Sequence, residues 1–154
     1  MAHKILFYNI ESRVGKGQQN EATDVLLVKF FLREIAEASK RPSAQVLGQP
    51  FIPPTPTLLL DATPSNDLFQ WIEGYQKAKK QSTWIDFRPD GIVSPVPLEN
   101  MQPTYNVRGT NIYRTRDRYT LYALNFEYSQ MFPDSWANLA RDPKIPSTLR
   151  DRFG

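Results

Sequence analysis

Thirteen prolines in a chain of 154 residues divide the sequence into short segments, and this division limits the fold more than any other feature. The prolines gather between stretches of regular hydrophobic spacing, most densely at Pro50, Pro53, Pro54 and Pro56. A proline fixes its own φ, lacks a backbone donor and restricts the preceding residue to extended conformations. We therefore expect short helices and strands joined by long, ordered loops.

Hydrophobic spacing predicts a strand and a long helix in the first quarter of the chain. A strand is expected over residues 4–10, where β-forming residues lie between polar flanks. A glycine-containing loop then leads into a helix from about Glu21 to Ala38. One face of this helix carries apolar residues at spacings of three and four, namely Val25, Val28, Leu32 and Ile35.

Further helices are expected after the proline-rich connection. Thr63-Pro64 predicts the start of a second helix, because threonine caps helices and proline suits the first helical position. Leu68, Ile72 and Tyr75 share one face of that helix. Residues 95–118 have no clear periodicity. Residues 119–131 could form a helix or a strand, and their apolar spacing favours a helix. A short helix over 134–140 and a last turn starting near residue 146 follow.

Composition favours one mainly α-helical domain over residues 1–154. Apolar residues make up 40% of the chain, enough for a single core. There is no cysteine, so neither disulfides nor thiolate metal sites can form. We expect no secretory signal, because the apolar stretch near the N-terminus is short. We also expect no membrane span, because no run approaches about 18 apolar residues.

Several short motifs resemble the small three-helix peptidoglycan-binding-like domain. They are Asp24-Val25-Leu26-Leu27-Val28-Lys29-Phe30-Phe31-Leu32, Leu60-Asp61-Ala62-Thr63, Leu68-Phe69-Gln70-Trp71-Ile72 with Tyr75-Gln76, and Pro89-Asp90-Gly91-Ile92-Val93-Ser94-Pro95. Val14-Gly15-Lys16-Gly17 with Asn20 is similar to a leader found before some divergent members. The resemblance implies a three-helix core over 14–95 with an insertion at 39–57, followed by a helical extension over 96–154. Ala62 and Ser94 stand where the family has glycine.

Aromatic and polar residues near these motifs predict a ligand-binding groove. Aromatic faces pack on sugar rings, while amides and carboxylates bind hydroxyl or peptide groups. The predicted ligand-binding residues are Asp61, Tyr75, Gln76, Trp84, Arg88 and Asp90. Trp71 and Tyr75 are also compatible with a place in the core, which is the commoner role for such residues. Independently of any ligand, Asp90-Gly91 predicts a tight turn.

The sequence gives no pattern for catalysis, so we expect neither an enzyme nor a cofactor. The single histidine, His3, lies near the N-terminus, where ordered sites are uncommon. Asp61, Asp67, Asp86 and Asp90 do not match the spacing of a calcium loop, so we expect no metal site. The Gly-Lys-Gly segment lacks the full spacing of a phosphate-binding loop. No motif selects an acid and base pair of carboxylates for glycoside hydrolysis.

A second set of residues predicts protein contacts. Arg114, Arg116 and Arg118 alternate and would share one face of a strand. Such a row with Tyr113 has the chemistry to bind nucleic acid. The small excess of 19 basic over 16 acidic residues argues against this function. Arginine is also enriched at protein interfaces, and this is the interpretation we favour. The predicted interface residues are Phe51, Ile52, Tyr113, Arg114, Arg116 and Trp136.

The sequence therefore leaves two functional hypotheses. The first is a non-catalytic module that binds peptidoglycan, as the resemblance implies, made in the cytoplasm and delivered by a phage, contractile injection or secretion particle. The second is a structural or docking protein of such a particle, for which we expect neighbouring protein subunits as partners in an oligomer or larger assembly. Long proline-rich arms favour the second hypothesis, because extended arms can bury large surfaces on a neighbour.

Overall fold

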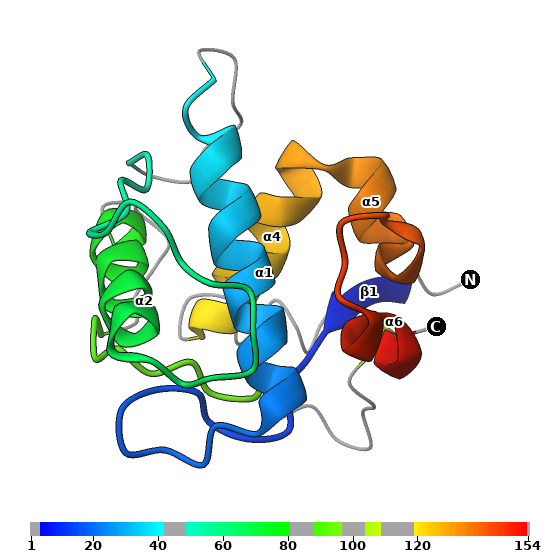
Figure 1. The fold of residues 1–154 in the computed structure, drawn as a ribbon. Coiled ribbons are helices and arrows are strands. Elements are labelled where there is room, and N and C mark those ends of the chain that lie inside the picture. The colour runs from blue at the N-terminus through cyan, green and yellow to red at the C-terminus, as the bar shows by residue number, and fades with distance from the viewer. Residues whose placement is uncertain (1–3, 42–48, 81–87, 97–103, 109–118, 154) are drawn as a thin grey trace.

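The computed structural model describes residues 4–41, 49–80, 88–96, 104–108 and 119–153. The fold is mainly α-helical, as predicted, with α2 on one side of α1, α5 and α6 on the other, and α4 running behind α1 (Figure 1). The elements are β1 (Lys4–Tyr8), α1 (Ala22–Ala38), α2 (Asn66–Lys79), β2 (Thr104–Arg108), α4 (Thr120–Met131), α5 (Pro133–Ala137), the 3-10 turn η1 (Leu139–Arg141) and α6 (Ser147–Phe153). Within the part of the chain described, no helix is long and apolar enough to cross a membrane.

The strands β1 and β2 pair antiparallel, with Ile5 opposite Val107 and Tyr8 opposite Thr104. β1 ends two residues before the predicted end of the strand, because the side chain of Asn9 binds the backbone of Val96 instead of continuing the strand. β2 lies in the segment for which the sequence predicted no regular structure. Its partner is about a hundred residues away, so a local pattern does not reveal the pairing.

The buried apolar side chains form a single core that joins all the larger helices. The predicted packing between the first two helices is confirmed, since the residues on both predicted faces are buried together: Val25, Val28, Leu32, Leu68, Ile72 and Tyr75. Buried residues after position 96 belong to the same core, including Leu121, Leu124, Tyr128 and Leu149. The described part of the C-terminal third is therefore an integral part of the core.

The starts of the two long helices are fixed by polar side chains. The Glu21 carboxylate accepts hydrogen bonds from the amides of Thr23 and Asp24, which places the start of α1 where the sequence predicts it. α2 begins at Asn66, and Ser65 caps it by accepting from Leu68 N. The predicted cap at Thr63 is wrong, because the Thr63 amide instead donates to the Asp61 carboxylate in a turn before the helix.

The described part of the proline-rich segment covers one face of α2. Phe51 packs edge-on against the rings of Trp71 and Tyr75, at centroid distances of 5.6 Å in both cases. Trp71 Nε1 donates to Thr55 Oγ1 at 2.6 Å. Phe51 is buried, so its predicted role as an anchor for a partner protein is wrong. The neighbouring Ile52 is 83% exposed.

Among the described residues, four side-chain amides each bind both a backbone N–H and a backbone C=O elsewhere in the chain. We call these pairs amide clamps, and they are Asn9 with Val96, Asn20 with Gly15, Asn125 with Tyr8, and Gln76 with Gly91 and Ile92. An amide offers a donor and an acceptor at the spacing of a peptide group. The clamps therefore satisfy backbone groups that would otherwise be unpaired in irregular segments.

Candidate functional site

Two loops meet at one side of the molecule and form the framework of the candidate site. The first loop (11–20) and the second loop (88–96) are joined by an isolated bridge in which Val14 and Val93 exchange hydrogen bonds of 2.9 and 2.8 Å. Gly15 has a φ of +156°, and a Cβ at this position would lie 2.7 Å from the carbonyl oxygen of Gly91. Glycine is therefore required at position 15 for the two loops to approach. These loops also carry the leader segment and the last motif of the resemblance.

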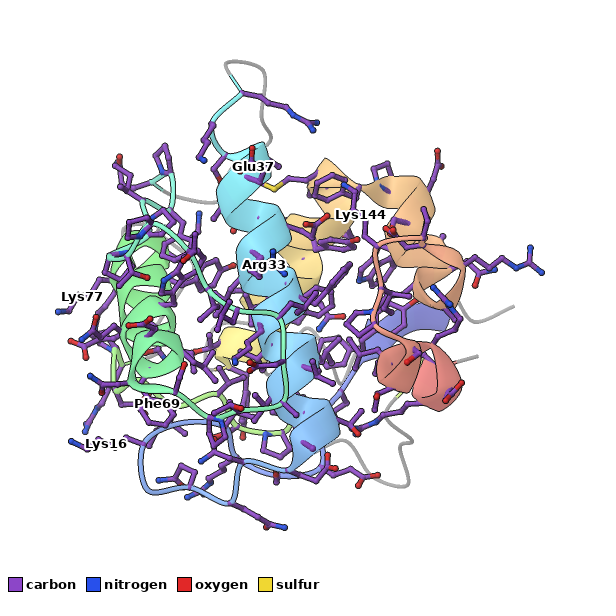
Figure 2. All side chains as sticks on the ribbon, viewed as in Figure 1. Lys16, Arg33, Glu37, Phe69, Lys77 and Lys144 are labelled. Carbon is purple, nitrogen blue, oxygen red and sulfur yellow. The ribbon has the colours of Figure 1, made fainter. Side chains whose placement is uncertain are left out.

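The first loop is held by its own side chains. Asn20, whose φ is 54°, accepts from Gly15 N and donates to Gly15 O, with both distances at 2.8 Å. The same Asn20 amide donates to Gln18 O at 2.9 Å. Lys16 projects from this loop into solvent at the edge of the molecule (Figure 2). The loop thus presents polar side chains from a fixed backbone.

The second loop contains the predicted Asp-Gly turn, which the structure confirms. Gly91 has a φ of 74°, in the left-handed region that glycine adopts without strain. The Asp90 carboxylate accepts from Ile92 N at 3.0 Å. Gln76 Oε1 accepts from Gly91 N at 2.8 Å, which fastens the turn to α2.

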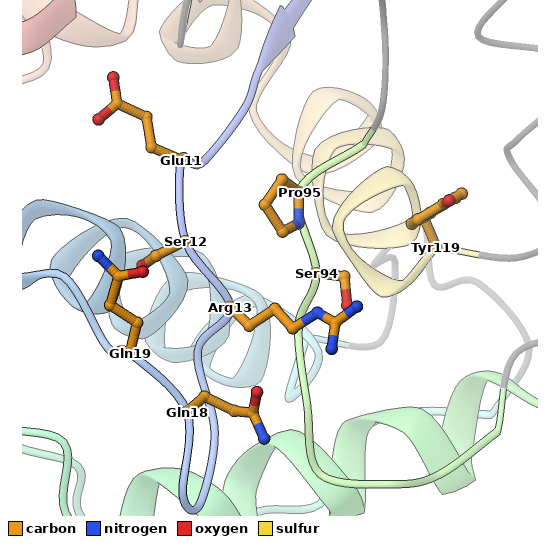
Figure 3. A pocket seen from close by; sticks show the side chains of 8 residues that line it. All are labelled: Glu11, Ser12, Arg13, Gln18, Gln19, Ser94, Pro95 and Tyr119. Atoms are coloured by element: carbon orange, nitrogen blue, oxygen red, sulfur yellow. The ribbon is translucent and has the colours of Figure 1, made fainter.

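An open groove of about 640 Å³ lies between the two loops and the start of α4 (Figure 3). The residues that line it are Glu11, Ser12, Arg13, Gln18, Gln19, Ser94, Pro95 and Tyr119. In Figure 3 the Arg13 side chain extends across the groove toward Ser94. A smaller hollow of about 80 Å³ shares Ser94 and Tyr119 with the groove and includes Gln76, Arg88 and Asp90. We call the two together the loop groove.

The loop groove offers charged and neutral hydrogen-bonding groups beside one aromatic ring. The guanidinium groups of Arg13 and Arg88 are exposed and can bind carboxylates through paired hydrogen bonds. The amides of Gln18 and Gln19 can donate and accept. Tyr119 is partly buried, so its ring forms a fixed wall. This arrangement is suited to binding a polar ligand, since small-ligand sites combine a few placed polar groups with apolar walls.

Tyr75 lies inside the protein, so its predicted role as a ligand contact is wrong. Its side chain has no exposed surface, and its hydroxyl donates to the Glu127 carboxylate at 2.9 Å. Burial raises the pKa of Tyr75 well above its ordinary value, and the nearby Glu127 charge raises it further. Trp71 is buried as well. The alternative considered from the sequence, that both rings belong to the core, is correct.

Gln76 lines the smaller hollow of the loop groove, and its amide binds several groups of the protein itself. Its two Nε2–H donors are shared among Asp90 Oδ1 at 3.1 Å, Ile92 O at 3.0 Å and Thr120 Oγ1 at 2.9 Å, while Oε1 accepts from Gly91 N. The residue is buried. Gln76 therefore holds the second loop against α2, and very little of its side-chain surface is open to a ligand.

The remaining predicted ligand residues separate into three cases. Arg88 and Asp90 line the smaller hollow of the loop groove, and their role as ligand contacts stays a prediction. Asp61 is not among its lining residues; its carboxylate accepts from Lys29 Nζ at 2.7 Å, and this contact lowers its pKa below the ordinary value. Trp84 lies outside the described residues.

Of the remaining predicted interface residues, only one lies in the part of the chain that the structure describes. Trp136 is partly buried against the core, its Nε1 lies 3.3 Å from Asn125 Oδ1, and its carbonyl accepts from the Tyr8 hydroxyl. Tyr113, Arg114 and Arg116 lie outside the described residues. Sequence reasoning missed Arg13, Gln18 and Tyr119, although the first two flank the glycine-containing loop.

Metal binding finds no support in the described residues. They contain no group of three or more histidine, cysteine or acidic side chains that could hold an ion.

Comparison of the chain with protein-family models, with curated proteins and with solved structures finds no match. The resemblance to the peptidoglycan-binding-like domain therefore stays a prediction.

Proposed function

We propose that this protein is a non-catalytic module that binds a cell-wall polymer of glycan and peptide in the loop groove. The observation that carries the proposal is the bridge between Val14 and Val93, which joins the leader segment to the last motif of the resemblance at an open polar groove. The backbone of both loops is held by contacts within the protein, so binding requires ordering mainly of side chains.

The chemistry of the loop groove supports a ligand of this class. Peptidoglycan displays hydroxyl, amide and carboxylate groups along a repeating chain. Arg13 and Arg88 provide positive charge for carboxylates, and the glutamine amides provide donors and acceptors for hydroxyl and amide groups. The Tyr119 ring offers a face for a sugar ring. A particle of the phage or contractile injection type is the proposed carrier.

A second candidate function is assembly within such a particle. Its support is the proline-rich segment, where Ile52 is 83% exposed and Leu59 is 72% exposed. Apolar side chains of this kind fill pockets at protein interfaces. The wall-binding proposal ranks first because it rests on a defined groove.

Sedimentation with purified cell-wall sacculi tests the wall-binding proposal. Arg13→Ala should weaken binding by about tenfold, as expected for the loss of a charged hydrogen bond of about 1.5 kcal/mol. Lys77→Ala is the matched control, because it removes an exposed cation that projects from α2, away from the groove (Figure 2). Equal binding by both variants would contradict the proposed site.

The same preparation distinguishes the second candidate and checks for catalysis. If assembly is the function, the parent protein should not sediment with sacculi, and Ile52→Asp with Leu59→Asp should reduce its association in sedimentation velocity. Labelled peptidoglycan should stay uncut by the parent protein. Soluble fragments that disappear when one acidic residue is changed would reveal a carboxylate site and refute the non-catalytic assignment.

A further inference from the structure

A buried carboxylate connects the wall of the loop groove to the C-terminal helix. Asp24, in the first turn of α1, has no exposed surface. It accepts hydrogen bonds from Glu11 N, from Ser12 N at 2.8 Å and from Ser12 Oγ at 2.8 Å. Glu11 and Ser12 are lining residues of the groove. Asp24 therefore fixes the backbone on one side of the groove.

The positive charge opposite Asp24 comes from the other end of the chain. Arg152 Nη1 donates to Asp24 Oδ1 at 2.7 Å, and the Arg152 side chain is only 12% exposed. Its Nη2 lies 3.9 Å from Glu11 Oε1. A buried carboxylate that loses its ion-pair partner is strongly destabilised. The position of Glu11 and Ser12 therefore depends on Arg152 through Asp24.

The helix that carries Arg152 is held mainly by tertiary contacts. α6 has seven residues, and a helix of this length is not stable alone in water. Leu149 is buried in the core, and the ring of Phe153 packs edge-on against Tyr8 at 5.2 Å. Figure 1 shows α6 beside β1. The Arg152 to Asp24 ion pair is therefore one of the tertiary contacts that hold α6 in place.

We infer that Arg152 is a positioning residue of the loop groove, and that docking of α6 and binding of a ligand in the groove stabilise each other. This inference rests on the proposed function, because the groove is the proposed binding site. Linkage is reciprocal, so a ligand that favours the ordered groove also favours docked α6. The C-terminal helix then acts as a regulatory element for wall binding.

Amide hydrogen exchange tests the coupling without any ligand. In Arg152→Gln, the Glu11 and Ser12 amides should exchange about tenfold faster or more, since their acceptor Asp24 loses a charged partner. Amides within α2 should keep their parent rates. Arg150→Gln is the matched control, because Arg150 lies on the same helix but binds the carbonyls of Ala140 and Ile145. Unchanged exchange at Glu11 and Ser12 in Arg152→Gln would overturn the inference.

Sacculus binding then tests the effect on the groove. Arg152→Gln should bind sacculi several-fold more weakly than the parent and Arg150→Gln, and Arg152→Lys should recover part of the loss because it retains the charge. If Arg152→Gln fails to fold by circular dichroism, Arg152→Lys replaces it in the exchange experiment, with an intermediate acceleration expected. Faster exchange with parent-like sacculus binding would overturn the positioning role. Absence of sacculus binding by the parent would refute the proposed function, while the exchange rates would still decide the coupling of α6 to the loop.

Discussion

The two sides of α4 hold their neighbours by different means. Toward α1, the Tyr128 ring packs against Phe31 at a centroid distance of 5.0 Å and against Phe30 at 5.9 Å. Toward α2, the contact is polar: Lys79 Nζ donates to Glu127 Oε2 at 2.7 Å, and neither side chain is exposed. One contact is apolar and aromatic, and the other is a buried ion pair.

The difference shows which contacts can shift and which cannot. The hydrophobic effect that drives the apolar contact is non-directional, so this contact sets the orientation of the helices less strictly than an ion pair does. A buried ion pair requires one geometry, because either charge alone would be costly in the interior. Tyr75 and Thr120 add directional hydrogen bonds on the same side. The polar side therefore fixes the placement of α2, which carries Gln76 under the loop groove.

The largest expected effect follows from breaking the ion pair. Glu127→Gln leaves the Lys79 ammonium buried without its opposite charge, and we expect a loss of about 3–5 kcal/mol in the free energy of unfolding. Urea denaturation measures it. The triple variant Lys79→Met, Glu127→Leu, Tyr75→Phe removes the charges and the hydroxyl that depends on them, and its stability should return close to that of the parent. A single variant as stable as the parent would show that the pair does not hold α2.

Truncation of a buried apolar side chain on α1 or α2 should lower the free energy of unfolding by somewhat less, on average, than the loss of the ion pair. Leu32→Ala in α1 and Ile72→Ala in α2 each remove a fully buried side chain, and we expect losses of about 2–5 kcal/mol for each. Similar losses for the two variants would show that the apolar core extends to both α1 and α2. The two sides of α4 would then differ only in their polar contacts. A loss below about 1 kcal/mol for either variant would contradict the packing described above.

The smallest effect for a single residue is a loss of folding stability at alkaline pH, and it involves tyrosines on both sides of α4. Burial raises the pKa of Tyr75, Tyr128 and Tyr8 in the folded protein. Their stabilising effect is complete below the unfolded pKa of about 10 and decreases above it, because only the unfolded chain then loses the proton. At pH 11, each tyrosine that stays protonated in the folded state should lower the free energy of unfolding by about 1.4 kcal/mol relative to neutral pH.

Lys79 has the opposite sign, since burial lowers its pKa and stability then rises with pH up to about 10.5. The three tyrosines should outweigh this single lysine. Urea denaturation between pH 8 and 11 measures the net effect, and Tyr128→Phe should make the decrease less steep. A stability that does not fall above pH 10 would contradict burial of these hydroxyl groups.

The sequence predicted the helices well because each one carries its own local pattern. The apolar spacing of α1 and the proline boundaries after it place the element within a residue or two. The aromatic side of α4 was partly predictable for the same reason, since Leu121, Leu124 and Tyr128 share helical spacing. Fold class and core therefore followed from short-range information.

The site was harder to predict because its parts are distant in sequence. Gln76 and Tyr75 are residue types that are common in ligand grooves. Their contacts with α4 show that both side chains point into the protein. Arg13 and Tyr119 are more than a hundred residues apart and have no local motif that connects them. The link between Arg152 and Asp24 likewise requires the whole fold. Contacts of this kind leave no periodic pattern in one sequence.

The amide clamps have a consequence for the chemical ageing of the protein. Hydrolysis of an asparagine or glutamine side chain replaces its NH₂ donor with a negatively charged oxygen. At Asn125 that oxygen would face the carbonyl of Tyr8, and at Asn9 it would face the carbonyl of Val96. Each such event would turn an attractive contact into a repulsive one, with little change in shape. Deamidation at any of these four positions would therefore loosen an irregular segment, so storage lifetime depends on the chemistry of a few amides as well as on unfolding.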